Sequence, residues 1–130
     1  MTWTADDTKR TSEALIDAAD SIQAYKKKNY DKLPEEQRKS MDEAFGALQD
    51  AATLAITKGV EQCLANLKDS ANTLIDVMAQ TKAKIEVAIE IHQGISLIAT
   101  LADLGAAIVA KDPAKVLTAV TTLEEKVKKA

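Results

Sequence analysis

The chain is poor in residues that interrupt helices. Its 130 residues include only four glycines, two prolines and four aromatic residues. Alanine, the strongest helix former, occurs 23 times, whereas glycine and proline are the usual helix breakers. The composition therefore predicts an all-α protein.

Cysteine is nearly absent as well. Cys63 is the single cysteine, so an internal disulfide is excluded and a reducing compartment would suit the chain. It flanks the apolar residues Val60, Leu64 and Leu67, and we expect a buried structural thiol. The start of the chain is acidic and lacks an apolar h-region. We therefore expect no cleavable secretory signal, with either a soluble cytoplasmic location or export by a signal-independent route.

No large excess of either charge sign is present. The net charge is −3, and acidic and basic residues alternate, so the concentrated basic face of a nucleic-acid-binding protein is missing. Two lysine runs stand out, at 26–28 and at 126–129. Both fall where helices are expected to end, and the helix dipole favours cations there. A role in binding phosphate or lipid headgroups is the alternative. The 46% hydrophobic and 28% charged fractions are ordinary for one soluble domain spanning 1–130.

Two helices are predicted in the first half of the chain. The first covers residues 5–28, with Thr4 as N-cap, and buries Leu15, Ala18, Ala19, Ile22 and Tyr25. The second begins with Pro34 as its first residue. Its apolar stripe comprises Met41, Ala44, Phe45, Leu48, Ala52, Ala55 and Ile56. We expect a turn between residues 57 and 70, at either Lys58–Gly59 or Lys68–Ser70.

The stretch 60–110 contains no proline and is predicted to form the central helix. Its apolar residues follow a heptad seam through Leu74, Met78, Ile85 and Ile95, interrupted by Thr81 and His92. From about Gly94 onward the expected helix is apolar on almost every side. Its polar residues form one narrow strip along the helix, made by Gln93, Ser96, Thr100 and Asp103. A last helix is expected from Pro113, capped by Asp112, with a seam at Val116, Val120, Leu123 and Val127. The predicted fold is an elongated antiparallel bundle of about four helices, with five as the alternative, and coiled-coil-like packing.

The sequence contains few candidates for metal-binding or catalytic residues. His92 is the only histidine, and without a Glu-x-x-His pair or a cysteine cluster we predict no metal and no cofactor. We expect it at the edge of the seam with one local hydrogen bond, or as a pH-sensitive contact. Lys82 and Glu86 are spaced for an ion pair on an exposed helix face. No Ser–His–acid arrangement or phosphate-binding glycine loop occurs, so an enzyme is not expected.

Two functions remain open. The first is a non-enzymatic bundle that binds another protein or associates with itself. The second is a membrane-active protein whose apolar segment Gly94–Ala110, flanked by flexible glycines at 94 and 105, becomes exposed when the bundle opens. In both cases the candidate partner or membrane surface is Ile95, Ile98, Leu101, Asp103, Leu104 and Ile108.

Overall fold

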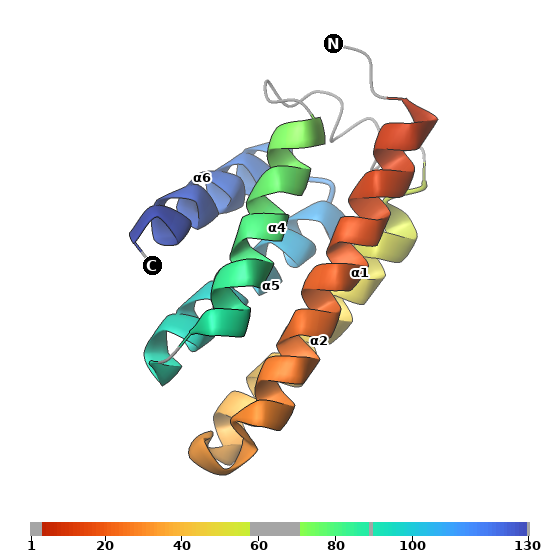
Figure 1. Cartoon of the computed structure of the whole chain (residues 1–130). Coiled ribbons are helices and arrows are strands. Elements are labelled where there is room, and N and C mark those ends of the chain that lie inside the picture. The colour runs from red at the N-terminus through yellow and green to blue at the C-terminus, as the bar shows by residue number, and fades with distance from the viewer. Residues whose placement is uncertain (1–3, 58–70, 89, 130) are drawn as a thin grey trace.

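The structure is a computed structural model and describes residues 4–57, 71–88 and 90–129. Helices dominate these ranges, and no strand occurs within them. The elements are α1 (Ala5–Lys28), the short 3-10 turn η1 (Tyr30–Lys32), α2 (Glu35–Leu54), α4 (Ala71–Val87), α5 (Ile91–Val109) and α6 (Pro113–Lys129). The predicted all-α bundle is confirmed (Figure 1).

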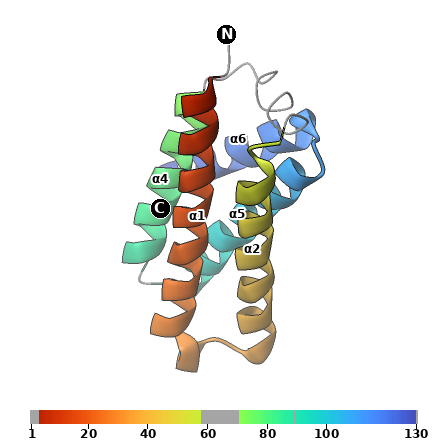
Figure 2. The ribbon, with the colours of Figure 1, turned by 90° about the vertical axis from the view of Figure 1, so that its right-hand side faces the viewer.

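The helices pack around α5. The hairpin formed by α1 and α2 lies along one side, and α4 lies beside α1 (Figure 1). Seen from the side, α5 and α6 run obliquely behind this hairpin (Figure 2). Helix α5 contacts α2, α6, α4 and α1, which explains why its sequence is apolar on most sides.

The start of α1 is stabilised by hydrogen bonds between residues close in the sequence. The Thr4 side chain accepts a hydrogen bond from the Asp7 backbone N–H at 3.0 Å, and the Asp7 carboxylate accepts one from the Thr4 N–H at 3.0 Å. This capping box satisfies two N–H groups that a helix start leaves without partners. The predicted bounds, the predicted cap and the burial of the predicted stripe are confirmed.

Two details of α2 differ from the prediction. Pro34 is the N-cap rather than the first helical residue, because its ψ of 156° is extended although its φ of −60° would suit a helix. The helix ends at Leu54, and Ile56 is 66% exposed, so its place in the buried stripe was wrong. The two candidate turns, at Lys58–Gly59 and Lys68–Ser70, and Cys63 lie outside the described residues.

The expected central helix is broken. Helix α4 ends at Val87, Glu90 adopts an extended conformation with φ −88° and ψ 130°, and α5 begins at Ile91. The heptad seam therefore does not continue from Ile85 to His92, because the interruption resets the helical phase. The His92 side chain is 79% exposed, so its predicted place at the edge of an apolar seam was wrong.

The glycines of α5 are sites of close helix contact. Both Gly94 and Gly105 are buried within the helix. A Cβ at Gly105 would lie 3.1 Å from the backbone carbonyl carbon of Ala47 in α2. The absence of a side chain thus lets α5 approach α2 closely.

The turn between α5 and α6 matches its sequence signals. The Asp112 N–H donates to the Ala107 carbonyl at 3.2 Å and the Lys111 N–H to the Ile108 carbonyl at 3.0 Å, the two bonds of a Schellman motif. The Asp112 carboxylate then accepts from the Lys115 N–H at 3.2 Å. The predicted cap, the predicted first residue Pro113 and the buried seam of α6 are confirmed.

Candidate partner-binding groove

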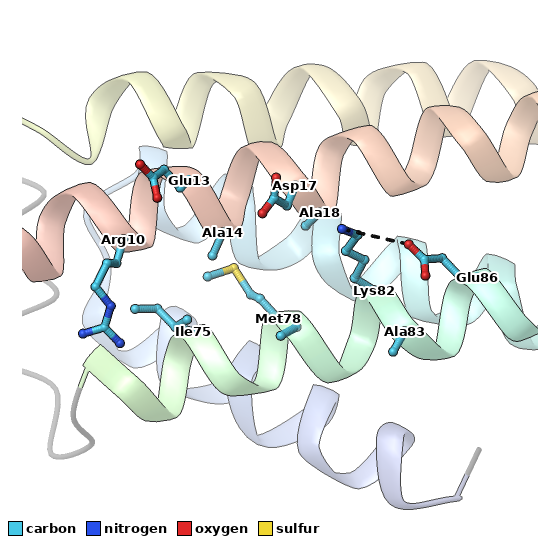
Figure 3. A pocket seen from close by; sticks show the side chains of 11 residues that line it. Arg10, Glu13, Ala14, Asp17, Ala18, Ile75, Met78, Lys82, Ala83 and Glu86 are labelled. Carbon is cyan, nitrogen blue, oxygen red and sulfur yellow. Dashed lines mark ion pairs between the residues drawn. The ribbon is translucent and has the colours of Figure 1, made fainter.

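A groove of about 480 Å³ runs between α1 and α4. These helices lie side by side and point in the same direction, so the groove follows both of them (Figures 1 and 3). On α4 it extends from Ile75 to Glu86, which at the α-helical rise is about 16 Å or three turns. The name α1–α4 groove is used below for the surface lined by Arg10, Glu13, Ala14, Asp17, Ala18, Ile75, Met78, Ala79, Lys82, Ala83 and Glu86.

The floor of the α1–α4 groove is apolar. Met78 is buried in the core and points into the groove between the two helices, while Ile75 lies beside it, partly exposed (Figure 3). Ala14 and Ala18 line the α1 side, one helical turn apart. Short side chains leave space for the side chains of a third helix, since ridges of one helix pack into grooves between others.

The rim of the groove carries acidic residues that lack a basic partner. Glu13 and Asp17 are exposed and lie one turn apart on α1. Within the described ranges neither has a Lys, Arg or His nitrogen within 4.0 Å. Like charges at this spacing destabilise a helix by about 0.2–0.5 kcal/mol. The α1 rim therefore presents negative charge available to an incoming cation.

The basic groups of the rim already have carboxylate neighbours. Arg10 lies 3.6 Å from Asp7 and 3.9 Å from Asp6. Lys82 lies 4.0 Å from Glu86 (Figure 3), which confirms the ion pair expected from their spacing. The separation is at the limit for an ion pair, and exposed pairs contribute about 0–1 kcal/mol. Lys82 thus gives the groove little net positive character.

The candidate surface predicted from the sequence lies mostly in the core. Ile98, Leu101, Leu104 and Ile108 are 0–3% exposed, Ile95 is partly exposed, and Asp103 is exposed. The apolar side chains are shielded in the folded bundle, as the sequence reasoning assumed. A partner reaches only Asp103 and part of Ile95 unless the helices separate.

Asp103 lies on the exposed side of α5 between two further hollows. One, of about 440 Å³, is shared with α2, and the other, of about 530 Å³, is shared with α6. The polar strip is only partly exposed, because Thr100 is buried and receives a hydrogen bond from Lys126 of α6 at 2.6 Å. Asp103 is therefore a surface residue of the polar strip, although the segment around it is apolar.

The described residues offer little for metal binding and one helix of membrane-spanning length. Among them, no three His, Cys, Asp or Glu side chains are grouped so that they could hold a metal ion. One described helix, α5, is long and apolar enough to cross a membrane, with half of that window buried in the bundle. A core helix of a soluble protein meets the same criteria.

Sequence reasoning missed the α1–α4 groove. A signal was present, since Ala14 and Ala18, and likewise Ala79 and Ala83, repeat at a spacing of four that places each pair on one helix face. Nothing in the sequence shows that the two pairs face each other. Comparison of this chain with protein-family models, with curated proteins and with solved structures yields no match.

Proposed function

We propose that this chain is a non-enzymatic helical bundle that acts by binding another protein. The observation that carries the proposal is the α1–α4 groove, where an apolar floor lies beside the unpartnered carboxylates of Glu13 and Asp17. An amphipathic helix fits such a groove when its apolar residues repeat at three- and four-residue spacing. The occupant we infer is a partner helix whose flanking residues are basic.

Charge complementarity supports a basic occupant. Of the five charged side chains that line the groove, Glu13, Asp17 and Glu86 are acidic, and the two basic ones already have carboxylate neighbours. A partner with lysine or arginine beside Glu13 and Asp17 relieves their mutual repulsion and gains electrostatic steering. An acidic helix meets like charges along the α1 rim instead.

Site-specific photo-crosslinking tests this proposal. A crosslinking amino acid replaces Ala83, an exposed residue of the groove, and the full chain is irradiated in a lysate of the organism that encodes it. We expect a crosslink to a basic, helix-forming segment of another protein, identified by mass spectrometry. Asp17→Lys should abolish this crosslink, because it reverses the charge that attracts the partner.

The matched control carries the crosslinker at Thr53, which is exposed on α2 and does not line the groove. Equal capture from both positions, or capture that survives Asp17→Lys, contradicts docking in the groove. A crosslink between two copies of this chain indicates self-association, and sedimentation velocity then measures the oligomer directly.

A membrane-active bundle is the second candidate, favoured by the length and apolar character of α5. Opening of the bundle transfers residues such as Leu101 and Leu104 to lipid, a gain of about 1.5–3 kcal/mol for each large side chain. A carboxylate is costly at bilayer depth, so Asp103→Asn should increase dye release from liposomes at pH 7. Absence of release at pH 5 and pH 7, for the wild type and the variant, excludes this function.

A further inference from the structure

Another hollow lies where α6 covers the first turns of α5, and it shares no residue with the α1–α4 groove. Its volume is about 160 Å³. It contains two lysines of the basic run 126–129, for which the sequence left open a role in binding phosphate or lipid headgroups beside the favoured helix-dipole interpretation. The name Lys126 pocket is used for the hollow lined by His92, Gln93, Ser96, Leu97, Lys126 and Lys129.

Lys126 of α6 is held against α5 by hydrogen bonds to two uncharged acceptors. Its Nζ donates to the Thr100 hydroxyl oxygen at 2.6 Å and to the Ser96 carbonyl oxygen at 3.2 Å, and both acceptors are uncharged. Over the described ranges, no carboxylate lies within 4.0 Å of this ammonium group. An ammonium group has three N–H donors, so one remains for an anion in the pocket.

Further donors face the same space. Lys129 follows Lys126 on the same side of α6, and Gln93, whose side-chain amide carries N–H donors, lines the pocket from α5. His92 lines the pocket as well, but its Nε2 faces Glu90 and is not counted among the donors. Two carboxylates stand beside this hollow: Glu90 lies 3.1 Å from His92 Nε2, and Glu125 lies one helical turn before Lys129 on α6. Neither carboxylate lines the pocket, whereas the ammonium groups of Lys126 and Lys129 belong to residues that do, so the lining itself carries positive charge.

We propose that the Lys126 pocket binds a phosphate group, carried either by a soluble phosphate compound or by a lipid headgroup. A phosphate has several acceptor oxygens and accepts charge-assisted hydrogen bonds from Lys126 and Lys129 together. Gln93 adds a neutral donor, and Leu97 closes the floor without an acceptor. The ligand neutralises the ammonium group that lacks a carboxylate partner.

Amide NMR of the full-length chain tests the proposal with inorganic phosphate, titrated at constant ionic strength against chloride. We expect saturable shifts at the backbone amides of His92, Gln93 and Ser96. Lys129→Gln should weaken the apparent affinity about tenfold, since it removes one charge-assisted hydrogen bond. Lys128→Gln is the matched control, because it removes the same charge from the same turn of α6 but does not line the pocket.

Three results overturn the proposal: no saturable shift, the same shifts with chloride, or equal weakening by Lys128→Gln and Lys129→Gln. The last result means that phosphate responds only to the general charge of the helix end. Lys126→Met provides a second variant, and its thermal unfolding, followed by circular dichroism, reports whether the bundle still folds cooperatively. A folded Lys126→Met protein that binds phosphate with wild-type affinity also contradicts the assignment.

Vesicles separate the two sources of the phosphate group. The same variants are sedimented with vesicles of phosphatidylcholine alone and of phosphatidylcholine containing phosphatidic acid. Binding that requires phosphatidic acid and Lys129 assigns the pocket to a lipid headgroup. Saturable binding of inorganic phosphate without vesicle binding assigns it to a soluble phosphate compound.

Discussion

The ring of Tyr25 in α1 lies directly against the backbone of Gly94 in α5. A Cβ built at Gly94 would overlap the Cζ and hydroxyl atoms of this ring, so any side chain at position 94 must displace Tyr25. The Tyr25 hydroxyl also donates to the carbonyl of Ile91 at 3.2 Å. One side chain thus fixes the first turn of α5 against the far end of α1.

Gly94→Ala should destabilise the protein by about 1–3 kcal/mol, because the added methyl group overpacks the contact with Tyr25. The measurement is the free energy of unfolding in urea. Gly46→Ala is the control: a Cβ at Gly46 meets no atom within 4 Å. That change should stabilise α2 by about 0.5–1 kcal/mol. Equal effects of the two substitutions contradict the close contact at Gly94.

Tyr25 should make stability depend on pH in alkaline solution. Burial raises the pKa of this phenol above 10.0. The unfolded chain loses the proton first as pH rises, so the contribution of Tyr25 to stability is complete below pH 10 and is lost as pH rises through the folded-state pKa. Urea unfolding of the wild type and of Tyr25→Phe from pH 8 to pH 11 measures this difference.

Tyr25→Phe removes the hydrogen bond to Ile91 and should cost about 0.5–1.5 kcal/mol at pH 8. Above pH 10 the gap between the two proteins should narrow, because only the wild type loses a neutral phenol. All other ionisable side chains are common to the two proteins, so their effect cancels in the comparison. A gap that stays constant to pH 11 contradicts the buried environment of Tyr25.

Helices with strong local signals were predictable from the sequence. Thr4 and Asp7 form a capping box within four residues of chain, and the α1 stripe from Leu15 to Tyr25 repeats regularly. The start of α6 is similar, because Asp112 and Pro113 define it without help from distant residues. Such signals involve only neighbours in the chain, so they can be interpreted before the fold is known.

The break between α4 and α5 was not predictable in the same way. Residues 80–93 contain no glycine or proline, and their local preferences are compatible with one continuous helix. The chain turns back there, and α5 packs against α2 and α6, so tertiary packing decides against local propensity. The α1–α4 groove has the same origin, since Ala14 and Ala83 come together only in the folded bundle.

Lys111→Gly should stabilise the protein by about 1 kcal/mol, because Lys111 has a φ of 57°, a left-handed conformation that glycine adopts without steric cost. Its position after α5 is the one that glycine usually occupies in a Schellman motif. Lys111→Ala is the control, since it removes the long side chain but keeps Cβ. Thermal and urea unfolding should show a gain in stability for Lys111→Gly alone. A similar gain for Lys111→Ala would mean that the lysine side chain, and not the backbone conformation, is unfavourable.

Ile85 and His92 occupy equivalent places in the heptad pattern, but their substitutions should change the free energy of unfolding by very different amounts. Ile85 is 1% exposed, and Ile85→Ala should cost about 2–5 kcal/mol through the cavity it leaves. His92 projects into solvent beyond the break, and His92→Gln should change the free energy of unfolding by less than about 0.5 kcal/mol. Urea unfolding near pH 7.5 measures both. If His92→Gln lowered the free energy of unfolding as much as Ile85→Ala does, the two residues would share one buried face. That result would contradict the helix break at Glu90.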